Sequence, residues 1–327
     1  MVIARSLVAA LRDAGHDAEV VVTPQNRFGR QAAAYFATWL TDVGSSEGRP
    51  IDRVISLRYP SYAVRHPHHV CWLNHTMREY YDLWDRFQSG LGARAQVKES
   101  IRRRLVRSAD WYFLKYNVRQ LFVQSRTVQQ RLWPSLQSRV LYPPAPQRPY
   151  RCDGYGNYIF MVSRLTSLKR VDLLLRALAM PAGAGIQAVI AGEGEERPAL
   201  EALIAREKLS DRVTLTGRLD DAELLEHLAR CRAVCFPPFN EDFGFVTVEA
   251  FAAQKPVITC SDSGGPAELV ADGEHGLVTE PTAGALADAL RRIMRDQSLA
   301  ERLGRQAHAR GAELTWARTV ETLLAVN

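Results

Sequence analysis

The chain has 327 residues, which is enough for two α/β domains of about 150 residues each. Its 42 basic and 36 acidic residues give a formal net charge of +6, which suits an anionic substrate or an anionic membrane surface but is too weak and dispersed for nucleic-acid binding. No apolar run reaches transmembrane length, the start is no signal peptide, and an odd count of five cysteines argues against a disulfide framework, so the sequence predicts a cytosolic protein.

The first half of the chain predicts helices and strands of one α/β domain. Residues 3–14 have the pattern of an amphipathic helix, and residues 18–22 have the composition of a buried strand. A proline-rich segment at residues 140–149 predicts an extended linker. Between these segments, strands are predicted at residues 54–56, 70–73 and 121–123, and helices at roughly 77–88, at 96–110 and after Ser125.

The second half alternates strands with helical patterns. Such alternation implies a parallel sheet with helices on both faces, and ligands of such sheets bind outside the carboxyl ends of the strands. The last stretch, residues 315–326, predicts one more amphipathic helix. The predicted strands are Tyr158–Val162, Ala188–Ala191, Val213–Thr216, Ala233–Phe236, Val257–Cys260 and Gly276–Val278.

Two carboxylates, Glu241 and Glu249, bracket an apolar segment that is broken by Gly244. An ionised carboxylate in an apolar run is costly unless something pairs with it. No basic residue lies within four positions of Glu249, so its partner is distant in sequence or is a ligand. The alternative, a helix on which Glu249 faces solvent, stays open.

Two cations follow the first strand of the second half. Arg164 and Lys169 lie between that strand and a helix predicted to start near Val171. A helix N-terminus offers free N–H groups and a positive dipole, and the two cations add charge, so the segment is a candidate diphosphate site. A solvated loop is the alternative.

Residues 94–115 form a basic amphipathic helix pattern, in which seven Lys and Arg residues are interspersed with Val97, Ile101, Leu105 and Val106. Such a pattern usually means a core face and a solvated face, and contact with a membrane surface stays open as the alternative. The run His66-Pro67-His68-His69 fits no usual zinc spacing, so no metal site is predicted.

These motifs together resemble the nucleotide-sugar site of the GT-B glycosyltransferases of retaining family 4. Glu241 and Glu249 have the seven-residue separation of that family, and Phe243-Gly244, Pro256-Val257 and residues 263–268 match the surrounding pattern. The resemblance implies an α/β GT-B fold, with two Rossmann-like doubly wound domains facing a cleft and a C-terminal helix crossing back to the first domain. The implied domains are an acceptor-side domain at residues 1–146, a nucleotide-sugar domain at 147–312 and the crossover helix at 313–327.

The resemblance also assigns roles to residues. It implies that Glu249 accepts from the ribose hydroxyls, that Glu241 contacts the donor sugar, and that backbone atoms near Gly217 hold the base. The residues implied to act in the reaction are Glu241, Arg164, Lys169 and His75, although His75 could instead cap the helix predicted near Met77. Those implied to bind the donor are Glu249, Phe243, Gly244, Phe245, Gly192, Gly217, Arg218 and Ser163.

The implied activity is transfer of a sugar from a nucleoside diphosphate sugar to an acceptor hydroxyl, with retention and without a metal or other cofactor. The acceptor (a sugar, a lipid-linked sugar or a small molecule) is not specified, and contact with the inner face of a membrane stays open. The alternatives are a non-catalytic sugar-nucleotide-binding protein and a nucleotide-sugar epimerase on the same fold.

The chain departs from the family pattern at its start. Family members begin with a strand and a glycine-rich turn before a helix like that of residues 3–14, and this chain begins at the helix. We therefore expect acceptor binding and folding of the first domain to be impaired in this chain, while the second half still binds nucleotide.

Overall fold

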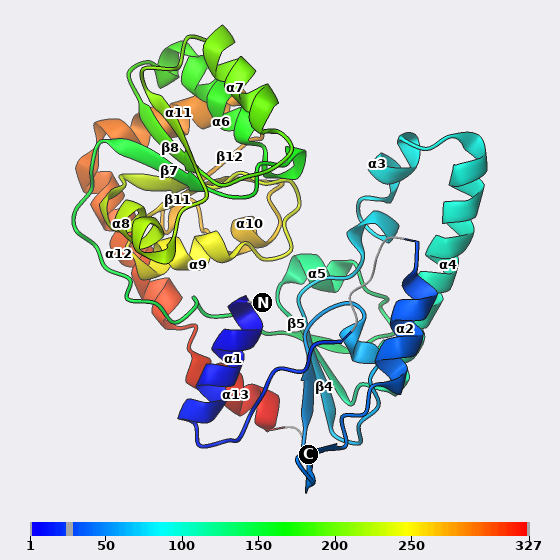
Figure 1. Ribbon diagram of the computed structural model, residues 1–327. Coiled ribbons are helices and arrows are strands. Elements are labelled where there is room, and N and C mark those ends of the chain that lie inside the picture. The colour runs from blue at the N-terminus through cyan, green and yellow to red at the C-terminus, as the bar shows by residue number, and fades with distance from the viewer. Residues whose placement is uncertain (1, 24–28, 326–327) are drawn as a thin grey trace. The chain divides into compact units, whose positions relative to one another are not determined.

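A computed structural model describes residues 2–23 and 29–325. The chain divides into two compact units (Figure 1). Unit 1 comprises Met1–Pro143 together with Trp316–Asn327, and unit 2 comprises Pro144–Thr315. Among the described residues, no helix is both long and apolar enough to span a membrane.

Unit 1 is built on a four-stranded parallel sheet whose strands lie in chain order. The central strand β4 is buried along its whole length, which explains why it is a continuous apolar run rather than an alternating one. The strands are β3 (Val54–Ser56), β4 (His69–Leu73), β5 (Gln120–Val123) and β6 (Ser138–Val140).

The helices of unit 1 pack around this sheet and around each other. The first and last helices, α1 and α13, are in contact, and the ring of Trp316 meets that of Trp72 edge-on at 6.2 Å. The predicted return of the terminal helix to the first domain is thereby confirmed. The elements are α1 (Val2–Asp13), α2 (Gln31–Leu40), α3 (Trp84–Ser89), α4 (Ala93–Tyr116), α5 (Arg126–Gln130), α13 (Trp316–Leu324), the 3₁₀ turns η1 (Ser61–Ala63) and η2 (Arg78–Tyr80), and the ribbon β1 (Ser45–Ser46) and β2 (Arg49–Pro50).

Unit 2 is a six-stranded parallel sheet in the order β12-β11-β10-β7-β8-β9. The order reverses between β7 and β10, so this pair marks the topological switch point of a Rossmann-like fold. All six strands were predicted from sequence with ends that agree within one residue. They are β7 (Tyr158–Val162), β8 (Gln187–Ala191), β9 (Val213–Gly217), β10 (Ala233–Cys235), β11 (Val257–Cys260) and β12 (Gly276–Thr279).

Helices cover both faces of this sheet, with α6, α7 and α11 on one side and α8 and α9 on the other (Figure 1). The main core of unit 2 is made by aliphatic residues of the strands and of the first set of helices. The helices are α6 (Val171–Ala179), α7 (Arg197–Arg206), α8 (Asp221–Arg230), α9 (Phe245–Ala252), α10 (Gly265–Leu269), α11 (Ala283–Arg295) and α12 (Gln297–Ala312), with η3 (Ser167–Lys169) and η4 (Pro181–Gly183).

Two predictions for the first half are wrong. Residues 18–22 form no strand, and Val20, Val21 and Val22 are exposed, because no described strand lies beside them to share backbone hydrogen bonds. The helix predicted at 77–88 is split into η2 and α3. The backbone leaves the helical region at Tyr81, where Tyr80 and Tyr81 turn to different buried carboxylates of α4.

Candidate functional site

The predicted site residues of unit 2 lie at the carboxyl edge of the sheet, and two of them meet at the switch point. The loop after β7 carries Lys169, and the loop after β10 carries Glu241. Because β7 and β10 are neighbours in the sheet, the two loops meet although 72 residues separate these side chains. Lys169 Nζ donates to Glu241 Oε2 at 2.6 Å.

Glu241 is held in place through its backbone as well as its side chain. Its N–H donates to the carbonyl of Ser263, and its carbonyl accepts from the N–H of Gly265, in an isolated bridge to the turn after β11. The Lys169 side chain is only 11% exposed. The other oxygen of Glu241, Oε1, has no partner among the described residues. The carboxylate therefore has a fixed position and an oxygen that can accept another hydrogen bond.

Glu249 lies on α9 with 7% of its surface exposed, so the alternative in which it faces solvent is wrong. Its partner is distant in sequence, as predicted. Arg148 Nη1 donates to Oε1 at 2.8 Å, and the hydroxyl of Tyr150 donates to the same oxygen at 3.3 Å. Burial raises the pKa of Glu249, and the charge of Arg148 opposes that rise. The second oxygen, Oε2, has no partner in the described part of the chain.

Sequence reasoning missed Arg148, Tyr150 and Arg170. Arg148 lies in the proline-rich segment that predicts a linker, and Tyr150 directly follows that segment. An unpaired buried carboxylate predicts a basic partner somewhere, but a sequence pattern does not show which of many arginines comes close.

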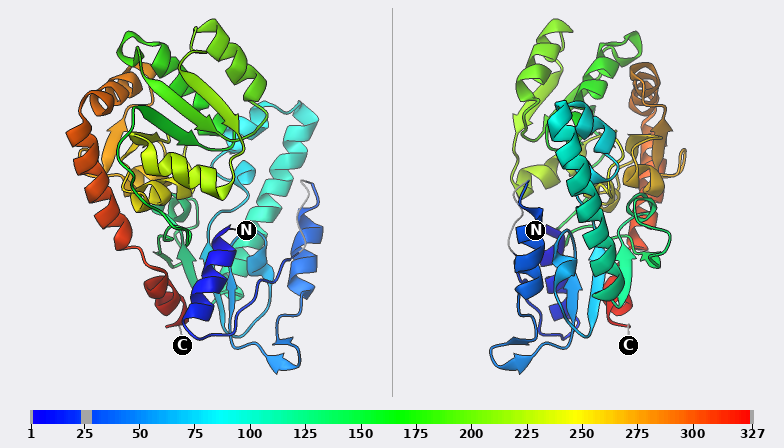
Figure 2. Two further views of the ribbon diagram at one scale, coloured as in Figure 1. Left: turned by 60° about the vertical axis from the view of Figure 1, so that its left-hand side comes forward. Right: turned by 90° about the vertical axis from the view of Figure 1, so that its right-hand side faces the viewer.

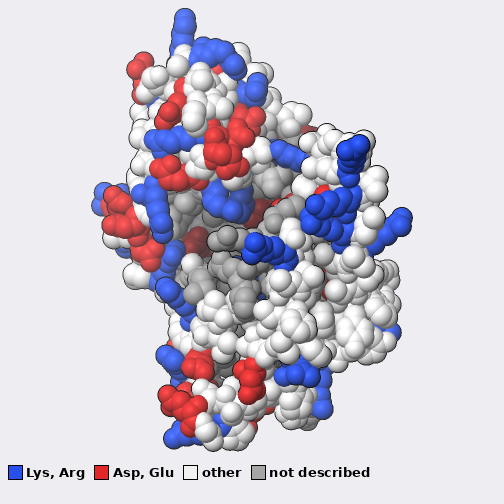
Figure 3. All heavy atoms as spheres, turned by 45° about the vertical axis from the view of Figure 1, so that its right-hand side comes forward, with Lys and Arg blue, Asp and Glu red and all other residues white. Residues whose placement is uncertain are grey.

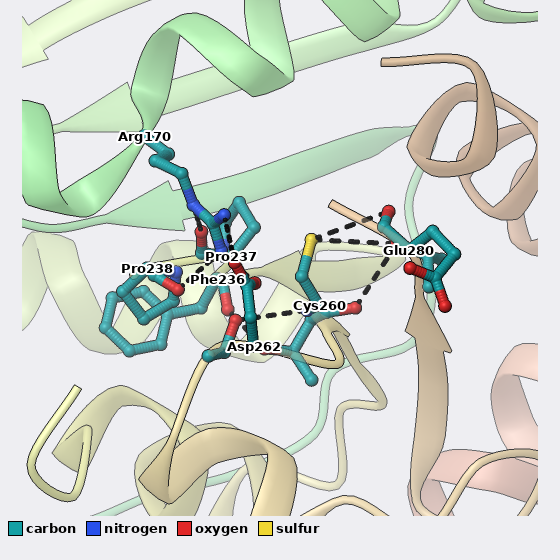
Figure 4. A network of polar contacts seen from close by, with 10 residues as sticks. Arg170, Phe236, Pro237, Pro238, Cys260, Asp262 and Glu280 are labelled. Carbon is teal, nitrogen blue, oxygen red and sulfur yellow. Dashed lines mark hydrogen bonds and ion pairs between the residues drawn. The ribbon is translucent and has the colours of Figure 1, made fainter. Parts of the chain in front are cut away.

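Arg170 connects three loops at the edge of the sheet through hydrogen bonds and an ion pair (Figure 4). Its guanidinium donates to the carbonyls of Pro237 and Pro238 at 2.7 Å each and to both oxygens of Asp262 at 2.6 and 2.9 Å. The loops after β7, β10 and β11 are thus joined by one side chain. Arg170 itself has a positive φ of 49° and ends η3 just before α6.

Two glycines of the site are required by close backbone packing. A Cβ at Gly192, where φ is +134°, would lie 1.8 Å from the carbonyl oxygen of Ser163. A Cβ at Gly244, where φ is +77°, would lie 2.8 Å from the side chains of Phe236 and Pro266. The need for glycine at Gly244 therefore arises from packing within the protein, in addition to any approach by a ligand.

Gly244 precedes the first turn of α9, so the amides of Phe243, Gly244 and Phe245 lie at that helix N-terminus as predicted. Phe243 is buried, and its ring meets that of Phe245 edge-on at 5.1 Å. The first amides of a helix have no intrahelical acceptor, so this end can receive an anionic group.

The remaining predicted residues of unit 2 lie at the same edge. Arg164 and Arg218 are exposed, and neither side chain pairs with another described residue. Ser163 directly follows β7, and its buried hydroxyl has no hydrogen-bond partner among the described residues. Gly217 ends β9 with φ +77°, and its carbonyl accepts from the N–H of Gly192.

His75 belongs to unit 1, where it follows β4. Its Nδ1 lies 3.0 Å from the carbonyl oxygen of the neighbouring Thr76, and the side chain is partly exposed. His75 does not cap η2. The residue before this turn is Met77, and no side chain makes a capping hydrogen bond there. The implied role of His75 near the donor stays a prediction.

The fold and the site together define a class of protein: a Rossmann-like α/β protein with a polar site at its topological switch point. Residues 148–310, which make up most of unit 2, match the model of the family "Glycosyl transferases group 1". The chain therefore belongs to this family through its second unit, which confirms the resemblance inferred from the sequence.

Two relatives illustrate the match. The chain is 33% identical over 152 residues to an alpha-D-kanosaminyltransferase of Streptomyces kanamyceticus, covering 46% of this chain and 39% of that protein. It is 34% identical over 174 residues to a D-inositol 3-phosphate glycosyltransferase of Mycolicibacterium smegmatis, covering 51% and 39%. The chain thus spans about two fifths of the length of these curated relatives.

Solved structures show that the likeness of fold extends over the whole chain. The sucrose-phosphate synthase of Thermosynechococcus elongatus has a TM-score of 0.73 at 21% identity and covers 98% of this chain and 90% of its own. Anabaena HepE, solved in complex with UDP and glucose, has a TM-score of 0.58 at 22% identity and covers 68% and 66%. The fold is that of the GT-B glycosyltransferases, as predicted.

Proposed function

We propose that this protein transfers a sugar from a nucleoside diphosphate sugar to an acceptor hydroxyl, with retention at the anomeric carbon and without a metal ion. Family membership of unit 2 supports a glycosyltransferase, and the complex of Anabaena HepE with UDP supports a nucleoside diphosphate donor. The donor base, the sugar and the acceptor are left open.

One observation carries the proposal. Glu241 and Glu249 are each held through one carboxylate oxygen by a cation from another segment, while the other oxygen is open. A carboxylate held in this way can accept hydrogen bonds from sugar hydroxyls without reorganising. In this proposal Glu249 takes the ribose hydroxyls and Glu241 the hydroxyls of the donor sugar.

The leaving diphosphate is neutralised by protein groups in this proposal. Arg164 and Lys169 supply positive charge from the loop after β7, and the N-terminus of α9 supplies amide donors. A phosphate oxygen takes the proton of the acceptor hydroxyl on the face of departure, so no protein nucleophile is assigned. The hydroxyl of Ser163, which has no partner in the part of the chain that the structure describes, is available for a further contact at the same edge.

The test is calorimetric titration of the whole chain with UDP, GDP and ADP, followed by a transfer and hydrolysis assay with the preferred nucleotide sugar. Glu249→Gln should weaken diphosphate binding at least about tenfold, because a charged hydrogen-bond set is worth roughly 1.5–3 kcal/mol. Lys169→Met should weaken diphosphate binding and leave nucleoside binding nearly unchanged.

Lys208→Met is the matched control, because Lys208 is exposed and precedes β9 at the opposite edge of the sheet. It should bind like the parent protein. Failure of the parent to bind any nucleoside diphosphate would overturn the proposal. Binding without transfer to any acceptor would favour a non-catalytic sugar-nucleotide-binding protein, and inversion at a sugar carbon without transfer would favour an epimerase.

A further inference from the structure

Helix α4 turns apolar side chains to solvent. Val97, Ile101, Leu105, Tyr112 and Tyr116 are between 53% and 65% exposed. Their spacing of four or seven residues places them on one side of the helix. The expectation that the apolar residues of this basic helix form a core face is therefore wrong for Val97, Ile101 and Leu105, whereas Val106 is buried as expected.

The buried side of α4 carries two acids, Glu99 and Asp110, beside the apolar Val106 and Leu114. Asp110 is fully buried, and Glu99 accepts a hydrogen bond from the hydroxyl of Tyr80 at 2.6 Å. The hydroxyls that donate to Asp110 are those of Tyr35, Tyr62 and Tyr81. Rotating α4 to bury its apolar stripe would strip these carboxylates of their donors, which is costly in a core. The outward apolar stripe is thus enforced by the network behind it.

Helix α2 extends the apolar surface. It lies beside α4 in both views of Figure 2, and its Phe36 and Leu40 are 61% and 54% exposed. A groove of about 350 Å³ runs between the two helices. It is lined by Ala32, Tyr35, Phe36, Trp39, Leu105, Val106, Ala109 and Phe113.

Positive charge surrounds this apolar face. Helix α4 carries seven basic residues and two acidic ones, and both acids are buried. Figure 3 turns this side of unit 1 toward the viewer, where Lys and Arg side chains stand out from a largely uncharged surface. The basic residues that are exposed on α4 are Arg94, Lys98, Arg104 and Lys115.

We propose that this face of unit 1, formed by α4 and α2, binds the surface of an anionic lipid bilayer. Exposed Leu, Ile, Phe and Tyr side chains would enter the boundary between head groups and acyl chains, while the flanking Lys and Arg side chains contact anionic head groups. A second copy of this chain fits less well. A two-fold contact through this face would set the same basic residues against each other. The inference does not rest on the proposed transferase activity.

The experiment is flotation of the whole chain with phosphatidylcholine vesicles, with and without phosphatidylglycerol, in the absence of any nucleotide sugar. Binding is expected only with phosphatidylglycerol and should weaken as salt is raised. Arg94→Glu/Lys98→Glu should weaken binding at least about 25-fold, because each basic residue near an anionic surface contributes about a factor of five. Ile101→Gln/Leu105→Gln should weaken it about tenfold or more at unchanged charge.

The matched control is Arg292→Glu/Arg295→Glu, two exposed residues of α11 in unit 2 that make the same change in net charge. It should bind vesicles nearly as well as the parent. Absence of vesicle binding, or equal loss in the control and in the α4 variants, would overturn the proposal. Light scattering tests the third outcome, a dimer. If the parent protein is a dimer that does not bind vesicles, and Ile101→Gln/Leu105→Gln makes it monomeric, the face binds a second copy of the chain.

Discussion

The contact between Arg148 and Glu249 gives the sharpest prediction about stability. At 2.8 Å, with side chains only 17% and 10% exposed, the pair is largely withdrawn from water. Removing one partner of such a pair leaves an uncompensated charge, at a typical cost of about 3–5 kcal/mol. Tyr150 still donates to Glu249, and Oε2 remains open, so we expect Arg148→Met to lower the free energy of unfolding by about 3 kcal/mol.

The loss should depend on pH in a defined direction. Burial already raises the pKa of Glu249, and removing Arg148 removes the charge that opposes the rise. The folded variant then holds a proton that the unfolded chain has released. The stability of the variant therefore falls as pH rises from the pKa of Glu249 in the unfolded chain to its raised pKa in the folded protein. Between these two values the loss is about 1.4 kcal/mol for each pH unit. The destabilisation should be greater near pH 8 than near pH 5.

Urea unfolding followed by far-UV circular dichroism measures this loss. All six tryptophans lie in unit 1, so their fluorescence reports separately whether that unit unfolds with unit 2. Arg148→Met/Glu249→Gln should regain most of the lost stability, because the amide removes the unpaired charge. Arg151→Met, which breaks only exposed ion pairs of the same segment, is the matched control and should change stability little. Equal losses at both pH values, or no recovery in the double variant, would refute the reasoning.

Three further outcomes are expected. Arg164→Ala should slow turnover and weaken nucleoside diphosphate binding while nucleoside affinity hardly changes; equal losses for both ligands in calorimetry would indicate a structural role. Turnover should survive EDTA, and a loss that Mn²⁺ or Mg²⁺ restores would contradict the metal-free proposal. Gly192→Ala should destabilise unit 2 by more than about 3 kcal/mol in urea unfolding, because its Cβ would meet the Ser163 carbonyl at 1.8 Å, whereas Gly284→Ala, in open space, should not.

The sequence predicted unit 2 far better than unit 1, for a physical reason. Strands buried on both faces of a parallel sheet are continuous apolar runs between helices, and this pattern is local. Lys169 and Glu241 could be placed at one sheet edge because each follows a predicted strand of a parallel sheet. In unit 1, residues 18–22 have a strand composition, but a strand also needs a neighbour, and neighbours are not encoded locally.

The donors that hold the site carboxylates could not be predicted from the sequence. Arg148 reaches Glu249 across 101 positions, and Arg170 reaches Asp262 across 92, so no spacing rule connects them. The inward-facing carboxylates of α4 are a similar case. The signal that was available is the abundance of tyrosines before that helix, whose hydroxyls need acceptors when buried.

The buried and partly buried carboxylates of this chain differ in how many of their oxygens accept hydrogen bonds from the protein. Asp110 accepts on both of its oxygens from tyrosines, and Glu99 accepts on one from Tyr80 and on the other from Arg102. Their acceptor capacity within the core is used by the protein itself. Glu241 and Glu249 are instead fixed through one oxygen only, which places an open acceptor at the sheet edge without a partner among the described residues. An acceptor without a donor is costly when water is excluded. The open oxygens of Glu241 and Glu249 therefore need a donor from a ligand or from solvent.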